Sequence, residues 1–205
     1  MANESNRAET ILTQLKEATR TRHEDVENAV DLTTGTRSIA DYRRLLQRFL
    51  GFYRACEGKL GEFVGVIPGL DFDSRRKSPM IESDLTATGL PASEVSETPV
   101  CAEVPRPESV AQALGMMYVL EGATLGGQYV ARHVKTSLTL DADNGCRFFS
   151  SYGAEVGPMW KRFGQVLIEQ AKTQDDRDEM IRFATSTFDA FGDWFRSMNS
   201  TVEKT

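Results

Sequence analysis

Apolar residues recur every three or four positions through most of the chain, which is the period of an amphipathic helix. Helices are expected over residues 7–30, 39–63, 107–137, 154–172 and 176–199. No segment shows the strict alternation of apolar and polar residues that is typical of a half-buried strand. The pattern therefore predicts an all-α protein, a bundle of five or six main helices.

The prolines interrupt this pattern in one place. Six of the seven prolines fall within residues 68–107. Because proline breaks a helix interior, this stretch is expected to be a looser connector, with Ser78 as the N-cap of a short helix that stops at Gly89. Neither flank carries a complete core of its own, so residues 1–205 are predicted to form a single domain that includes the connector.

Charge and composition limit the partners and the location. The chain has 30 acidic against 24 basic residues, a net charge of −6, whereas DNA-binding proteins present a basic footprint, so no nucleic-acid partner is expected. The absence of a long apolar run and of an apolar leader predicts no membrane association and a cytoplasmic protein. Three widely spaced cysteines suit a reducing compartment.

His23 is the first candidate for chemistry. It lies eight residues after Leu15 and three before Val26, so it shares the apolar face of its predicted helix. It is either a core histidine satisfied by a partner such as Glu27, one turn on, or a ligand to a bound group. Lys16 lies two turns earlier on the same side, about 10 Å along the axis. Taken alone, that lysine is a solvated surface residue.

The second candidate is a glycine-rich stretch of the helix predicted over residues 107–137. It contains Gly115, Gly122, Gly126 and Gly127, and each glycine costs up to ~1 kcal/mol relative to alanine in a helix interior. Gly122 and Gly126 are one turn apart on the same face. Two explanations remain open: close packing of another helix, or a flat ligand that lies against the backbone.

Taken together, these segments resemble a known family. Residues 15–19 (LKEAT) followed by His23 resemble the proximal helix of the heme oxygenase family. Residues 118–128 (YVLEGATLGGQ) resemble its distal helix in the bacterial form, and residues 184–191 (ATSTFDAF) resemble its last long helix more loosely. The resemblance spans residues 10–198 and implies a heme-oxygenase-like helical bundle.

The resemblance implies roles for individual residues. His23 matches the proximal histidine, the axial ligand of the heme iron. Gly122 and Gly126, with Gly127 beside them, match the distal glycines that let the helix backbone lie over the heme and leave room for dioxygen.

It also implies basic contacts to the heme propionates. Lys16 matches a residue that pairs with a propionate. Arg20 and Arg22 are further candidates because they lie close to that edge, and Lys161 and Arg162, in the helix predicted over 154–172, are candidates for the same part.

The implied activity is that of a biliverdin-producing heme oxygenase. In this family heme b is both cofactor and substrate, and it is cleaved with O2 and external electrons to biliverdin, carbon monoxide and Fe2+. No flavin or nicotinamide motif is visible, so an electron donor such as a ferredoxin or a reductase is implied. Biliverdin would then supply a bilin-binding photoreceptor or be a by-product of iron acquisition.

Two departures from the family pattern keep an alternative open. The animal enzymes carry an aspartate that organises a distal water where this chain has Ala123, and a propionate-facing tyrosine where it has Met117. A heme-binding carrier or sensor that does not degrade heme therefore remains the alternative. A di-iron oxidase of similar architecture is disfavoured, because no Glu-x-x-His motif occurs.

Overall fold

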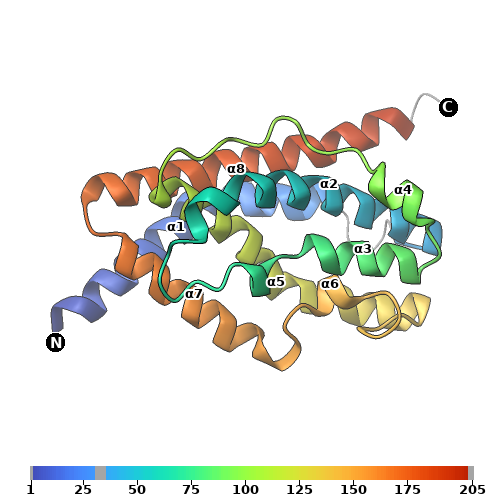
Figure 1. Ribbon diagram of the computed structural model, residues 1–205, viewed down its shortest axis with the longest axis horizontal. Helices are drawn as coiled ribbons and strands as arrows, with labels where there is room; N and C mark the ends of the chain where they lie inside the picture. Colours follow the sequence, from blue (N-terminus) through green and yellow to red (C-terminus); the bar gives the residue numbers. More distant parts are fainter. Residues whose placement is uncertain (1, 31–35, 203–205) are drawn as a thin grey trace.

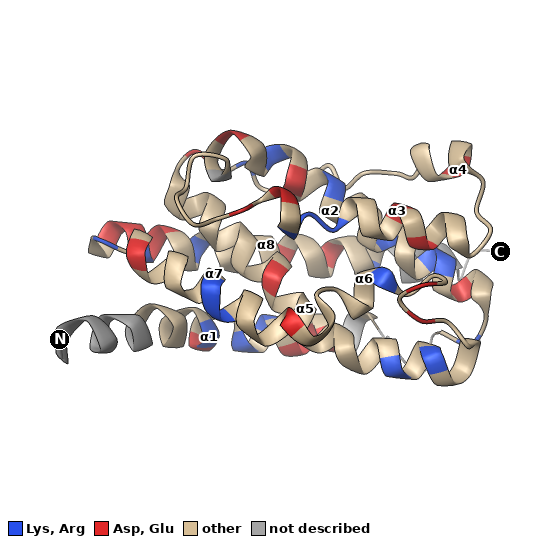
Figure 2. Ribbon diagram, turned by 60° about the horizontal axis from the view of Figure 1, so that its bottom comes forward, with Lys and Arg blue, Asp and Glu red and all other residues tan. Residues whose placement is uncertain are grey.

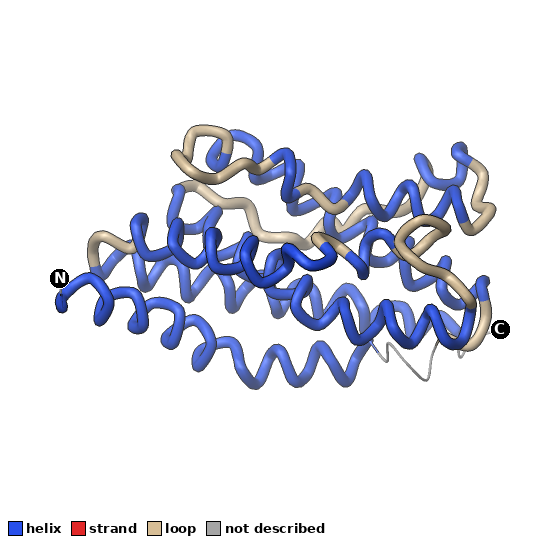
Figure 3. Tube along the Cα trace, turned by 90° about the horizontal axis from the view of Figure 1, so that it is seen from below, coloured by secondary structure: helices blue, strands red, loops and turns tan. Residues whose placement is uncertain are grey.

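The computed structural model describes the backbone of residues 2–30 and 36–202, and the side chains of 11–27, 30, 36–63 and 65–197. Within these residues every regular element is a helix and there is no strand (Figure 3), which confirms the all-α prediction. The elements are α1 (Ala2–Val30), α2 (Ile39–Val64), η1 (Asp73–Arg75), α3 (Ser78–Ala87), α4 (Ala92–Ser96), α5 (Val110–Leu138), α6 (Arg147–Ser150), η2 (Gly153–Glu155), α7 (Val156–Gln170) and α8 (Gln174–Val202).

Serine caps define where two of the long helices begin. The Ser38 hydroxyl accepts the backbone N–H of Asp41 at 3.1 Å, so α2 starts where the sequence predicted. Ser109 caps α5 in the same way, which places its start three residues after Pro107. Such caps satisfy N–H groups that have no partner inside the helix. The start of α3 differs by one residue from the prediction, because Lys77 rather than Ser78 occupies the N-cap position.

The long helices pack side by side around an aromatic core. α8 lies along both α1 and α5 (Figure 1). At the centre, the ring centroid of Phe52 lies 4.7 Å from that of Phe191, and the Phe49 and Phe195 centroids are 5.0 Å apart. One buried apolar cluster includes residues from all of the long helices. The assignment of residues 1–205 to one domain stays a prediction.

The proline-rich connector is more ordered than expected. It contains α3 and α4, and the segment after α4 runs back along α2 and α8 (Figure 1). There the Cys101 N–H donates to the carbonyl of Gly51 at 3.1 Å. A Cβ on Gly51 would lie only 2.3 Å from the carbonyl oxygen of Pro99. The connector thus packs onto α2 at a position that admits only glycine.

A buried carboxylate positions α6, a short helix that the sequence did not predict. Asp84 of α3 accepts the backbone N–H groups of Arg147 and Phe148, each at 2.8 Å. These are N–H groups of the first turn of α6, where a carboxylate is favourable. The contact holds Phe148 and Phe149 against the centre of the bundle.

Charged residues of both signs are interspersed along the surface helices (Figure 2). In the part of the chain that the structure describes, no helix has the length and apolar character needed to cross a bilayer.

Candidate functional site

A cavity of about 980 Å³ lies between α1 and α5. Its volume is at the upper end of the range of roughly 300–1,000 Å³ that is typical of small-molecule sites. The remaining walls are mainly aromatic side chains of α2, α6, α7 and α8, namely Phe49, Phe52, Tyr53, Phe148, Phe149, Trp160, Phe188 and Phe191. Such a lining suits a large, flat, apolar ligand.

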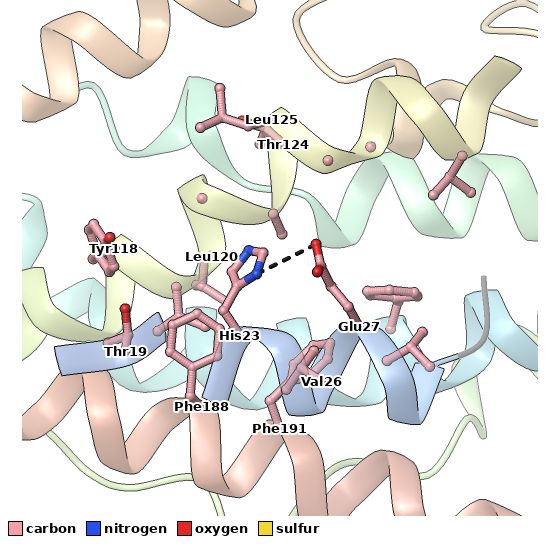
Figure 4. A pocket seen from close by; sticks show the side chains of 18 of the residues that line it. Thr19, His23, Val26, Glu27, Tyr118, Leu120, Thr124, Leu125, Phe188 and Phe191 are labelled. Carbon is pink, nitrogen blue, oxygen red and sulfur yellow. Dashed lines mark ion pairs between the residues drawn. The ribbon is translucent and has the colours of Figure 1, made fainter. Parts of the chain in front are cut away.

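His23 lines this cavity and is not a core residue. It projects from α1 toward the stretch of α5 that carries Thr124 (Figure 4), and its side chain is 54% exposed. Its Nδ1 lies 3.5 Å from a carboxylate oxygen of Glu27, and its ring stands edge-on to Phe188 with centroids 5.9 Å apart. Because Nδ1 faces the Glu27 carboxylate, Nε2 is the nitrogen that remains available to a ligand in the cavity.

A single histidine does not make a protein-built metal centre. Among the described side chains, no group of three or more His, Cys, Asp or Glu residues is placed to hold a metal ion. A metal at His23 would therefore have to bring most of its own ligands, as a metal macrocycle does.

The glycines of α5 divide into two kinds. A Cβ on Gly122 or Gly126 would meet no described atom within 4 Å beyond its own helix turn, and both residues line the cavity. A Cβ on Gly115 would lie 2.3 Å from the Met180 carbonyl oxygen, and one on Gly127 would lie 2.8 Å from the Phe149 carbonyl oxygen. Gly127 also lines the cavity, but helix packing accounts for glycine there and at Gly115, whereas Gly122 and Gly126 leave open space on the side of the cavity.

The predicted basic residues fall into two groups. Lys16 and Arg20 are exposed and line the cavity. Lys161 and Arg162 are exposed on α7 but are not among the lining residues, and Arg162 lies 3.7 Å from the Glu155 carboxylate. The structure therefore brings only the α1 pair to the cavity.

Charge changes sign along α1 where it borders the cavity. The lining residues Lys16 and Arg20 precede His23, and the lining residues Glu24 and Glu27 follow it. One end of the cavity wall is thus basic and the other acidic, so an anionic group is favoured at the Lys16 end.

Five residues with hydroxyl groups line the cavity and were not predicted as site residues, namely Thr19, Tyr53, Tyr118, Thr124 and Tyr129. The Tyr53 hydroxyl donates to the Leu120 carbonyl at 3.1 Å, and the Thr124 hydroxyl donates to the Glu121 carbonyl at 2.7 Å. Tyr118 also lines the cavity; burial raises its pKa, and hydrogen bonding with Thr19 opposes the rise. The sequence held no signal for Tyr53, because an aromatic residue on an apolar helix face is typical of a core.

The structure also contains a buried ionic cluster, which we call the Glu121 cluster, formed by Arg75, Lys77, Glu121 and Tyr152. The Glu121 carboxylate accepts from Arg75 Nη1 at 2.7 Å and from the Tyr152 hydroxyl at 2.8 Å. Lys77 Nζ lies 4.0 Å from the same carboxylate and 3.6 Å from the centre of the Tyr152 ring. The Arg75, Lys77 and Glu121 side chains are each at most 3% exposed.

Lys77 is the member of this cluster that burial disfavours. Its Nζ is buried without a hydrogen-bond partner. Burial lowers its pKa from 10.5 to about 8, although Glu121 opposes the shift. The folded state therefore loses the proton near pH 8 while the unfolded chain keeps it, so the free energy of unfolding rises as the pH rises from about 8.

Replacing Lys77 with methionine is expected to stabilise the protein at pH 7 by roughly 1–3 kcal/mol, because it removes a poorly compensated buried charge. The substitution also removes most of the rise in stability between about pH 8 and pH 9.5. Urea unfolding at several pH values measures both effects. A variant less stable than wild type at pH 7 would show that the ammonium is a net stabilising member of the cluster.

Comparison with known proteins places this arrangement in a family. The heme oxygenase family model matches residues 9–197. A heme oxygenase of Xanthomonas campestris pv. campestris (strain 8004) is 30% identical over 152 residues, which are 73% of this chain and 86% of that protein. Heme oxygenase PigA of Pseudomonas aeruginosa is 27% identical over 128 residues, 62% of this chain and 61% of that protein.

Solved structures show the same fold. The NO- and CO-bound heme oxygenase of Neisseria meningitidis superposes with a TM-score of 0.75 at 22% identity, covering 93% of this chain and 92% of that one. The Synechocystis heme oxygenase-1 in complex with heme gives 0.74 at 17% identity, with 95% and 94% covered. The helical bundle with its cavity between α1 and α5, together with a family match over most of its length, shows that this chain belongs to the heme oxygenase family.

Proposed function

We propose that the chain binds heme b in the cavity between α1 and α5 and cleaves it to biliverdin, carbon monoxide and Fe2+, with O2 and electrons from an external donor. The observation that carries the proposal is the pairing of His23 on one wall with Gly122 and Gly126 on the other. Membership of the family supports it. Bound heme supplies the iron that activates dioxygen and the porphyrin that is cleaved.

His23 is proposed as the axial ligand of the heme iron. It stands in the wall of the cavity with Nε2 as the nitrogen left for a metal. The Glu27 carboxylate, 3.5 Å from Nδ1, favours the tautomer that has its proton on that nitrogen, which leaves the lone pair on Nε2. Phe188 supports the ring from α8 and limits its rotation.

The α5 wall is proposed to keep protein ligands away from the other side of the iron. Gly122 and Gly126 present backbone alone, and Ala123 adds only a methyl group. The hydroxyl protons of Tyr53 and Thr124 are committed to the carbonyls of Leu120 and Glu121. Each of these hydroxyl oxygens can still accept a hydrogen bond from water, so water in the cavity is held by acceptors and backbone rather than by a carboxylate.

Lys16 and Arg20 are proposed to pair with the heme propionates. Both line the basic end of the α1 wall, while Glu24 and Glu27 make the other end unfavourable for a carboxylate. The macrocycle is thereby oriented with its propionate edge toward Lys16.

The double change Lys16→Glu and Arg20→Glu is expected to weaken hemin binding about tenfold or more. It replaces two exposed cations that attract the propionates by two carboxylates that repel them. The effect should shrink as salt is added. Hemin titrations followed by absorption measure it. The matched control is Lys161→Glu with Arg162→Glu, the same charge change outside the lining, which should leave affinity near wild type. A larger loss in the control would assign the propionate contacts to α7 instead.

The second candidate function is a heme carrier or sensor that does not degrade heme. Ala123 favours it, since this lining residue offers no side-chain hydrogen bond to a water above the iron. In that case heme stays intact in the presence of a reductant and air.

Turnover separates the two functions. The chain is loaded with hemin and treated in air with ascorbate, or with a ferredoxin and its reductase as donor. The proposal expects the heme absorption band to decay, with biliverdin and iron recovered in equal amounts. Heme recovered intact from a complex that binds it tightly would support the carrier or sensor. The proposal includes a cytoplasmic location and two fates for the product, delivery of biliverdin to a bilin-binding photoreceptor or its release as a by-product of iron acquisition.

A further inference from the structure

Glu121 anchors α5 from behind the cavity wall. It directly precedes Gly122, yet it does not line the cavity, whereas its neighbours Leu120 and Gly122 do. Its carboxylate turns instead toward Arg75 and Tyr152 in the Glu121 cluster. Burial of a carboxylate in an apolar stretch of helix costs desolvation free energy unless its partners compensate it. The burial of Glu121 therefore indicates that its contacts have a role.

The partners of Glu121 come from separate parts of the fold. Arg75 belongs to η1 in the connector, and its second guanidinium nitrogen reaches the Met159 carbonyl of α7 at 3.5 Å. Tyr152 lies between α6 and η2. The cluster therefore ties one point of α5 to the connector, to α7 and to the segment after α6.

The stretch that follows this point has few such ties. Gly122 and Gly126 have no side chain with which to pack, although Thr124 between them is buried, and at Gly127 the helix lies so close to α6 that a Cβ would be 2.8 Å from the Phe149 carbonyl oxygen. Residues 122–126 of the cavity wall thus lie between two positions at which α5 is held by the rest of the protein, Glu121 and Gly127. A shift at either point moves the backbone that faces the ligand.

We propose that Glu121 is a positioning residue: its contacts with Arg75 and Tyr152 fix the Gly122–Gly126 backbone over the cavity and so limit the size of the ligand admitted between α5 and bound heme. The consequence for heme rests on the proposed function. The anchoring itself is a property of the chain without heme and is tested separately.

Two variants weaken the anchor to different degrees. Tyr152→Phe removes only the hydroxyl that donates at 2.8 Å and keeps the ring that lies 3.6 Å from Lys77 Nζ. Glu121→Gln removes the charge that faces Arg75. Tyr42→Phe is the matched control, because it deletes another buried hydroxyl, bonded to the Gly145 carbonyl at 3.0 Å, away from the cavity lining.

The first measurement is amide hydrogen exchange of the heme-free proteins, read by mass spectrometry on peptides covering residues 119–130. The anchor predicts exchange about tenfold faster in this segment in Tyr152→Phe than in Tyr42→Phe, since one hydrogen bond that holds the segment is lost. Glu121→Gln should show a larger increase; if it does not fold, Tyr152→Phe decides alone. Equal exchange in the two tyrosine variants would overturn the proposal.

The second measurement compares a bulky with a small ligand on the ferric heme complexes. Tyr152→Phe is expected to bind imidazole about five- to tenfold more tightly than wild type while cyanide affinity stays within about twofold, because loss of one hydrogen bond relaxes the wall. Tyr42→Phe should match wild type for both. An unchanged imidazole-to-cyanide ratio in Tyr152→Phe would show that Glu121 does not set the ligand size. If wild type binds no heme, the proposed function fails and the exchange measurement still decides the anchoring.

Discussion

Replacing His23 with alanine is expected to abolish the absorption spectrum of histidine-ligated ferric heme. Among the described residues that line the cavity, only His23 carries an imidazole, and its Nε2 is the nitrogen proposed to meet the metal. Because the side chain is 54% exposed, its removal should change the free energy of unfolding of the heme-free protein by no more than about 0.5 kcal/mol. Hemin titration with absorption detection, together with urea unfolding, measures both effects.

The other histidine provides the control for this experiment. His133 lies on α5 but not in the cavity lining, so His133→Ala should keep the wild-type spectrum. Added imidazole should restore the spectrum of His23→Ala in part, because the substitution leaves space beside Phe188. An unchanged histidine-ligated spectrum in His23→Ala would refute the ligand assignment.

Alanine at Gly122 or Gly126 is expected to stabilise the heme-free protein. A Cβ at either position meets no described atom within 4 Å, so the substitution gains the helix propensity of alanine, up to ~1 kcal/mol each. Alanine at Gly115 or Gly127 should instead destabilise, because the Cβ would lie 2.3 or 2.8 Å from a backbone carbonyl oxygen. Denaturant unfolding of the four heme-free variants measures this difference in sign.

A larger side chain at Gly122 should, by contrast, weaken the binding of heme. A leucine at Gly122 points into the space where the macrocycle is proposed to lie and would occupy part of it. Gly122→Leu should therefore weaken hemin binding by at least about tenfold while the heme-free fold is retained. Wild-type hemin affinity in this variant would mean that the cavity beside Gly122 is not the heme site.

The helices and the place of His23 in the cavity wall were accessible from sequence because both depend on local periodicity. His23 shares a helical face with Leu15 and Val26, and helical geometry alone places it on the inner side of α1. The start of α2 follows from its Ser38 cap, whereas α5 was expected from residue 107 and starts three residues later, after the Ser109 cap. α4 and α6 were missed because each has only one or two turns, and α6 is held by Asp84, which is 63 residues away from Arg147 in the chain.

The division among the glycines was not accessible from sequence. Gly126 and Gly127 are adjacent and both line the cavity, yet a Cβ on Gly126 would meet open space and one on Gly127 would lie 2.8 Å from the Phe149 carbonyl oxygen. That difference depends on the placement of α6, which local pattern does not encode. The Glu121–Arg75 pair was missed for the same reason, since its partners are 46 residues apart and one lies in the proline-rich connector.

The basic residues show that a site residue could be predicted where it lies close to His23 on the same helix, and not where it lies on another helix. Lys16 and Arg20 reach the cavity because they lie two turns and one turn, respectively, before His23 on the same helix. Lys161 and Arg162 had no such reference point, and the structure places them on the outer side of α7, where Trp160 rather than either of them lines the cavity. Their proposed contact to a propionate is tested by the charge-reversal control above.

The location of iron in crystals grown with hemin tests the central claim most directly. Anomalous diffraction at the iron edge is predicted to place one iron about 2 Å from His23 Nε2, the length of a histidine–metal bond, with Gly122 and Gly126 facing it from α5. An iron peak elsewhere, or one in the cavity without His23 as its ligand, would contradict the account.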